Sequence, residues 1–279
     1  MPTVATVVEQ IQGDYFLDYA LFSGSIRHYI ARTLEDDWKR NPSDAASRFF
    51  SVAIYREEYT AYEDAGALLD AWLSSARRPP SAMERLLRYK AADVRLANMF
   101  ERHQVRSAQD LYRLLELQAW IPFRWEMRYP HIDLVKVLKI TCSFLWSSAR
   151  NQKEHGVAGF NKIKHGLLVV PTAKRYASAM PDAPAMIFVT RGEPAEHPMS
   201  LWTVPFSPDE VDRRLESLFL VEKSLRLLCL LYVMKNWPAV VTARCDGYLM
   251  EIFSDVAGRD LYRFLCEVSV KGDLAGAGW

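Results

Sequence analysis

Apolar residues recur at the spacing of a helix surface over most of the first 165 positions. The stripe that predicts a first helix, over residues 14–38, consists of Phe16, Tyr19, Phe22, Ile26 and Ile30. The same spacing predicts helices over 43–73, after the double proline at 79–80, after Ser107, and from Asp133 to about Arg150. Two prolines predict an irregular stretch over 120–131.

Two short strings have the composition of helix starts. Ser107-Ala-Gln-Asp110 is a variant of the capping box, with an acidic residue at the third helical position. Ser207-Pro-Asp-Glu210 offers a serine cap, a proline at the first helical position and a glutamate at the third. The second helix is expected to run to about Asn236 and to stop at Pro238, and a last helical pair is expected over 246–255 and 258–270.

The pattern changes after Gly166. Residues 167–171, 185–190 and 200–204 are short β-branched or aromatic runs separated by proline, glycine and polar clusters. They predict a small antiparallel β-sheet inserted at about 167–204. The expected fold is therefore mainly α, a helical bundle with this insertion, in a single domain spanning 1–279. The alternative is a division into a helical region over 1–119 and a second region over 120–279.

Charge and hydropathy exclude several classes of protein. The 35 basic and 34 acidic residues give a net charge of +1, so nucleic-acid binding would need a local patch. The most apolar window, 215–234, contains Glu222, Lys223 and Arg226, which favours a buried amphipathic helix over a membrane span. The amino terminus resembles no signal peptide, and the four cysteines are widely spaced. We expect a cytoplasmic protein without disulfides, metal, cofactor or membrane contact.

Candidate chemistry gathers where the helix from Asp133 ends. Within residues 150–165 the chain places Arg150, Asn151, His155, Asn161, Lys164 and His165. Histidine titrates near neutral pH and suits proton transfer, whereas arginine keeps its charge and offers a planar fork to phosphate oxygens. Metal-independent cleavage of RNA needs proton transfer at two oxygens and a cation for the phosphorane. One histidine per chain is one too few, so we expect a two-fold dimer to supply both.

The string Arg150-Asn-Gln-Lys-Glu-His155 resembles the motif of the HEPN superfamily, an arginine, often followed by asparagine, with a histidine four to six residues later. Asn161-x-x-Lys-His165 is similar to a signature at a helix end in some divergent members. The resemblance covers about residues 105–166 and implies a helical, commonly dimeric, metal-independent RNase of toxin–antitoxin, defence or RNA-processing systems. It implies that Arg150 contacts phosphate, Asn151 is the adjacent polar residue, and His155 is the acid and base. Asn161, Lys164 and His165 would position the phosphate, and an antitoxin or another protein would be a partner.

Simpler interpretations stay open. Cations at 150, 153 and 164 are favoured at a helix carboxyl end by the helix dipole, and His155 and His165 would then be half-exposed cap residues. The alternative function is accordingly a non-catalytic helical protein that binds a protein or small molecule. The aromatic and basic stretch 120–131 could stack RNA bases on Trp120, Phe123 or Trp125. The carboxylates of residues 55–64 lack metal-site spacing and are expected on a solvated helix face.

Overall fold

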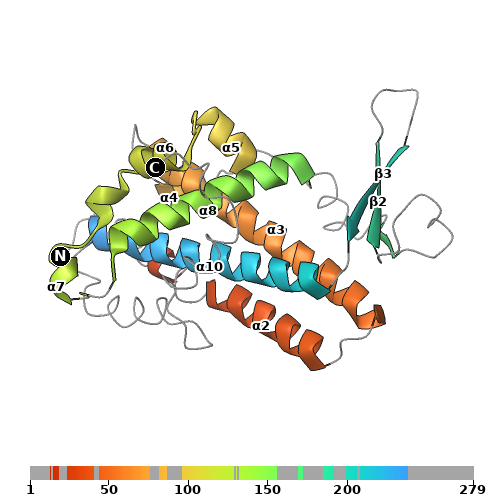
Figure 1. Ribbon diagram of the computed structural model, residues 1–279. Coiled ribbons are helices and arrows are strands. Elements are labelled where there is room, and N and C mark those ends of the chain that lie inside the picture. Colours follow the sequence, from red (N-terminus) through yellow and green to blue (C-terminus); the bar gives the residue numbers. More distant parts are fainter. Residues whose placement is uncertain are drawn as a thin grey trace. The chain divides into compact units, whose positions relative to one another are not determined.

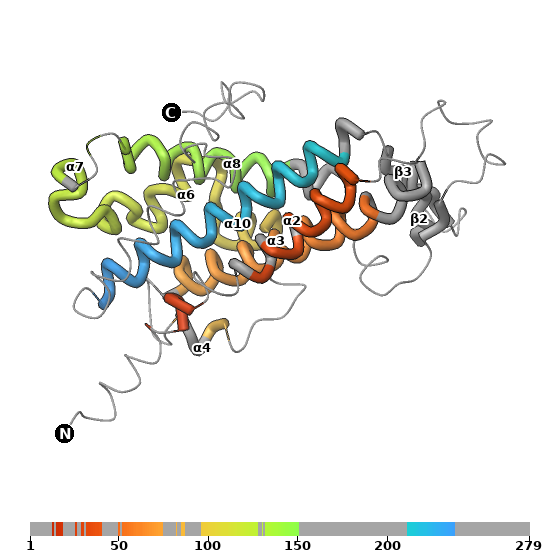
Figure 2. The backbone as a smooth tube through the Cα atoms, turned by 90° about the horizontal axis from the view of Figure 1, so that it is seen from below, coloured from red at the N-terminus to blue at the C-terminus, as the bar shows by residue number. Residues whose placement is uncertain are grey.

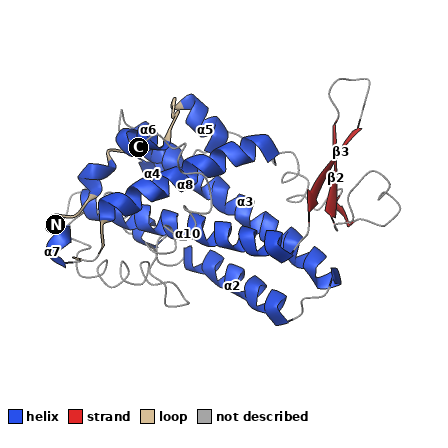
Figure 3. Ribbon diagram, viewed as in Figure 1, coloured by secondary structure: helices blue, strands red, loops and turns tan. Residues whose placement is uncertain are grey.

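The computed structural model describes residues 13, 15–18, 24–40, 44–75, 82–86, 96–128, 130, 132–155, 169–171, 185–191, 199–205 and 208–237. Helices dominate these residues, as Figure 3 shows, and the expectation of a mainly α protein is confirmed. The last expected helical pair, over 246–255 and 258–270, lies outside the described residues.

The helices follow one another along the chain in Figure 1. Their bounds are α2 Gly24–Arg40, α3 Asp44–Ser75, α4 Ala82–Leu86, α5 Leu96–Arg102, α6 Ala108–Leu114, the 3-10 helix η2 Leu117–Trp120, α7 Trp125–Arg128, α8 Leu134–His155 and α10 Pro208–Asn236. Helix α10 begins at the proline and ends at the asparagine that the sequence indicated. Helix α8 continues beyond its expected end near Arg150, so that prediction was too short.

Three strands lie between α8 and α10 in the sequence. They are β1 Val169–Pro171, β2 Ala185–Arg191 and β3 Met199–Pro205, antiparallel in the order β1-β2-β3. Val169 pairs with Phe188, and Ile187 pairs with Thr203 on the other side of β2. Strand β2 is therefore the central strand of the three.

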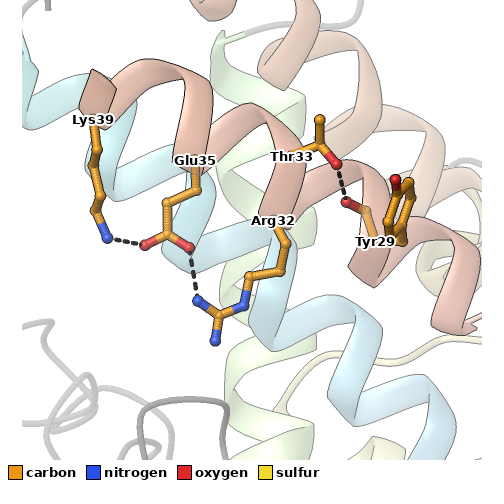
Figure 4. A network of polar contacts seen from close by, with 5 residues as sticks. All are labelled: Tyr29, Arg32, Thr33, Glu35 and Lys39. Carbon is orange, nitrogen blue, oxygen red and sulfur yellow. Dashed lines mark hydrogen bonds and ion pairs between the residues drawn. The ribbon is translucent and has the colours of Figure 1, made fainter. Parts of the chain in front are cut away.

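The chain forms two compact units. The first unit draws on residues 1–26, 63–150 and 220–279, and the second on 27–62 and 151–219. The second unit contains a core of Trp38, Ile54, Val211 and Leu215, with Leu34, Phe50 and Phe219 packed against it. Along α2, Glu35 pairs with both Arg32 and Lys39, and the Thr33 hydroxyl donates to the carbonyl of Tyr29 (Figure 4).

Aromatic rings form much of the core of the first unit. The ring of Tyr232 lies 5.1 Å from Phe16 and 5.3 Å from both Trp72 and Trp120, measured between centroids. Gly13 packs directly on Trp237, because a Cβ at position 13 would lie 3.1 Å from that indole. These contacts join α10 to segments from the amino-terminal part and the middle of the chain, which Figure 2 traces from red through green to blue.

The middle of α10 is buried on every side. Every residue from 220 to 231 is buried, including Glu222, Lys223 and Arg226. The expectation of an amphipathic helix was therefore wrong for these three turns, because a helix that is buried all round has no solvent face. The Arg226 guanidinium lies 3.6 Å from the Glu222 carboxylate, one turn away, so the two buried charges offset each other.

No helix in the described part of the chain is long and apolar enough to cross a membrane. Cys142 and Cys229 are both buried free thiols of the first unit. Burial raises the pKa of each thiol well above its ordinary value, because the thiolate would lose its hydration. Neither thiol therefore has the character of a reactive nucleophile.

Candidate functional site

Helix α8 carries the first three candidate residues on one continuous piece of backbone. It runs from Leu134 to His155 and so includes Arg150, Asn151 and His155. Positions 151 and 155 are one turn apart, separated by about 40° around the helix axis, and position 150 lies about 100° from 151. The three positions therefore share the last two turns of one helix.

The sequence of α8 explains where the helix starts and which of its sides is buried. Its start is capped by Asp133, whose Oδ1 accepts a hydrogen bond of 3.0 Å from the amide of Lys136. Its inner stripe is buried at helical spacing and consists of Leu134, Val137, Leu138, Cys142, Leu145 and Ala149. This stripe anchors the helix and leaves the next residue, Arg150, exposed.

Arg150 is an available cation. Its guanidinium carbon lies 5.0 Å from the centroid of the Trp146 ring, one turn earlier on α8. No ion pair joins it to any described residue. A guanidinium that rests on an aromatic face keeps its outward hydrogen-bond donors, which suit a phosphate.

The second group of candidate residues follows α8 in the sequence. Asn161, Lys164 and His165 lie outside the described residues. Asn151 and His155 lie in α8, so their backbone positions are described, but their side chains are not. The described geometry of the candidate site is therefore one exposed arginine and the helical register of an asparagine and a histidine.

The aromatic and basic stretch divides into buried and exposed residues. Trp120 and Trp125 are each 3% exposed, and the indole of Trp125 donates to the carbonyl of Ile132 at 2.9 Å. The prediction that these two rings could stack RNA bases was wrong, because their faces are covered by the protein. Phe123 is 84% exposed and keeps that capacity.

Two polar clusters were missed in the sequence. In the first unit, one oxygen of Asp70 lies 2.7 Å from Nε2 of His103 and 3.1 Å from Nη1 of Arg102. The partners are more than thirty positions apart, so no local spacing announces them. The arrangement ties the end of α5 to α3.

The second missed cluster surrounds Glu58 in the second unit. The expectation of a solvated face over residues 55–64 was wrong for Glu58, which is only 7% exposed, and for Tyr55 and Tyr62, which are buried. The Arg214 guanidinium donates to the Glu58 carboxylate at 2.7 Å and lies 4.6 Å from the centroid of Tyr55. The Tyr62 hydroxyl shares a hydrogen bond with Ser217. Desolvation raises the pKa of Glu58, although the charge of Arg214 opposes the shift.

Neither cluster resembles a metal centre. Among the described residues, no group of three or more histidine, cysteine, aspartate or glutamate side chains could hold a metal ion.

Comparison with protein-family models, curated proteins and solved structures gives no match to this chain. Any assignment of function therefore depends on the residues of the chain itself.

Proposed function

We propose that this protein is a HEPN-like, metal-independent endoribonuclease or RNA-binding protein of a bacterial defence or stress system, acting in the cytoplasm. The observation that supports the proposal most directly is the extension of α8 through His155. Without this extension, a helix that ended near Arg150 would leave the register of Asn151 and His155 undefined. Because α8 extends through His155, the angles around the helix axis between positions 150, 151 and 155 are defined.

The chemistry follows from the residue types. The RNA 2′-hydroxyl attacks the adjacent phosphorus, its proton passes to a base, and the 5′-oxygen leaves after it receives a proton from an acid. His155 of one protomer would take the first proton and His155 of its partner would give the second. Arg150 would stabilise the charged phosphorane, and Asn151, Lys164, Asn161 and His165 would hold the phosphate. The products are a 2′,3′-cyclic phosphate and a free 5′-hydroxyl.

This mechanism has consequences for assembly. It needs a homodimer in which two copies of α8 contribute their histidines to one cleft. An antitoxin or another protein partner would regulate access to that cleft. We also propose that β1, β2 and β3 form a small insertion in the helical domain, following the motif helix in the chain.

The test is incubation of the pure protein with total RNA in EDTA. Wild type should cleave and leave cyclic phosphate ends, and Arg150→Ala/His155→Ala should not. Lys153→Ala is a matched control, because it removes a cation from the same helix about 160° away from position 155 and should retain cleavage. Loss of wild-type cleavage in EDTA, or full activity in His155→Ala, would refute the mechanism.

The second candidate function is non-catalytic binding of a protein or small molecule. The exposed side chains of Phe123 and Met127 favour it, because large apolar groups in water are common at binding surfaces. Absence of cleavage by wild type, together with a stable complex with another molecule, would support this second candidate.

A further inference from the structure

The turn formed by residues 123–127 presents an aromatic ring to solvent from a rigid base. Phe123 is 84% exposed and Met127 is 76% exposed, whereas Trp125 between them is buried. The turn is closed by two backbone hydrogen bonds, from Trp125 N to Pro122 O and from Met127 N to Arg124 O, both 3.1 Å. The Trp125 indole fixes the turn to the carbonyl of Ile132. Exposure of Phe123 is thus a property of an anchored turn.

A cation accompanies the exposed ring. The Arg124 guanidinium carbon lies 5.1 Å from the centroid of Phe123, and Arg124 forms no ion pair with any described residue. The backbone of Arg124 has a φ of 61°, in the left-handed region that is unfavourable for arginine. An asparagine or glycine would adopt this conformation at lower cost, so arginine at this position is not explained by the turn alone.

An aromatic ring beside a cation that forms no ion pair with a described residue matches the two chemical groups of a nucleotide. A base stacks on an aromatic ring whatever its sequence, and a guanidinium holds the neighbouring phosphate. Because Trp120 and Trp125 are covered, Phe123 is the one ring among these three aromatic residues that can accept a base. Glu126, exposed on the same turn, opposes phosphate binding and so limits the affinity.

We infer that Phe123 and Arg124 form a stacking platform for one nucleotide of single-stranded RNA, outside the α8 motif. This inference rests on the proposed function, which makes RNA the ligand. Phe123 would contact a base with one face of its ring, and Arg124 would contact a phosphate. The platform would hold the RNA strand without taking part in its cleavage.

The test uses Arg150→Ala/His155→Ala as the background, so that bound RNA is not cleaved. The probe is a fluorescent oligoadenylate of about ten nucleotides, compared with an abasic oligomer of equal length, and binding is followed by fluorescence anisotropy. Phe123→Ala should weaken oligoadenylate binding roughly fivefold to a hundredfold. It should leave binding of the abasic oligomer unchanged, because that oligomer has no base to stack.

Three further variants sharpen the result. Met127→Ala removes an equally exposed apolar side chain from the same turn and should change the affinity less than about twofold, since it removes no ring. Arg124→Asn suits the left-handed backbone and should weaken binding of both oligomers, with a smaller dependence on salt. Glu126→Gln should strengthen binding of both. All of these side chains are exposed, and circular dichroism should show unchanged folding.

The outcomes separate this inference from the proposed function. If wild type cleaves RNA but Phe123→Ala binds oligoadenylate as the background does, the platform is refuted and the nuclease stands. If wild type does not cleave but oligoadenylate binding depends on Phe123, the nuclease is refuted and the platform stands. If Phe123→Ala changes only the oligomeric mass in solution, the turn is a protein contact and the platform is refuted.

Discussion

The buried carboxyl group of Glu58 has a pKa that depends on its surroundings in the fold. It is held by Arg214 from α10 and lies near the Tyr62 hydroxyl, which approaches to 3.5 Å. Burial still dominates, so the pKa of Glu58 in the folded protein is higher than its ordinary value of 4.5. Protonation of this group therefore favours the folded state.

The raised pKa of Glu58 predicts how the stability of the protein changes with pH. Between pH 4.5 and the raised pKa, the folded protein binds a proton at Glu58 that the unfolded chain has released, so this group's contribution to stability falls as pH rises. The free energy of unfolding, measured in urea from pH 4 upward, should therefore fall for wild type relative to Glu58→Gln. Glu57→Gln controls for loss of one carboxylate. A constant difference between wild type and Glu58→Gln would contradict the prediction.

Ser107 stabilises the start of α6 through a reciprocal pair of bonds. Its hydroxyl accepts from the amide of Asp110 at 3.1 Å, and the Asp110 carboxylate accepts from the amide of Arg106 at 3.1 Å. The capping-box variant expected from the sequence is confirmed, with the carboxylate reaching one residue further back than in the standard box. Ser107→Ala should lower the free energy of unfolding by about 1 kcal/mol, measured by denaturant titration. Ser107→Asp should retain most of the stability, and an unchanged Ser107→Ala would show that the cap is unimportant.

At the scale of the elements, the sequence predicted those features that depend on neighbouring residues, such as where a helix starts. Proline at the first position predicted the start of α10 at Pro208, and helical periodicity predicted α8. Burial was less predictable, because Glu58 and Glu222 are buried only where Arg214 and Arg226 offset their charges. For the candidate site, the motif could be found in the sequence, but the exposure of Arg150 and the burial of Trp120 and Trp125 depend on packing.

The contact between α3 and α5 gives a further prediction. Asp70 receives both His103, which is largely buried, and Arg102, whose side chain is 43% exposed. Asp70→Asn should lower the free energy of unfolding by about 1–2 kcal/mol, because it weakens two charge-assisted contacts. Arg102→Ala should cost less than about 1 kcal/mol, since solvent screens its charge. Equal losses in the two variants would contradict this division.

At the scale of the whole molecule, each unit contains part of α3 and part of α10. Residues 44–62 and 208–219 of these helices belong to the second unit, and the rest of each helix belongs to the first. The net charge of +1 provides no long-range attraction for RNA. Any RNA binding by this protein must then depend on local cations such as Arg124 and Arg150.

Thiol labelling offers a test of how the first unit opens. Cys142 and Cys229 are buried on α8 and α10, and burial raises the pKa of both. In native buffer at neutral pH, both should resist a thiol reagent, and both should react at the same denaturant concentration. Mass spectrometry of the labelled peptides measures each site separately. Rapid labelling of either cysteine in the native protein would show that its thiol is accessible and would contradict this prediction.

The position of α10 in the chain has a consequence for synthesis on the ribosome. The middle part of the first unit ends at Arg150, yet the fully buried segment of α10 that belongs to the same unit ends at Leu231, 231 − 150 = 81 residues later. At ordinary elongation rates this interval lasts roughly 4–16 seconds. During that time the nascent chain exposes the apolar stripe of α8 and the aromatic residues that later surround Tyr232. The protein is therefore most vulnerable to aggregation before it is complete, and slow translation of this interval would lower its yield.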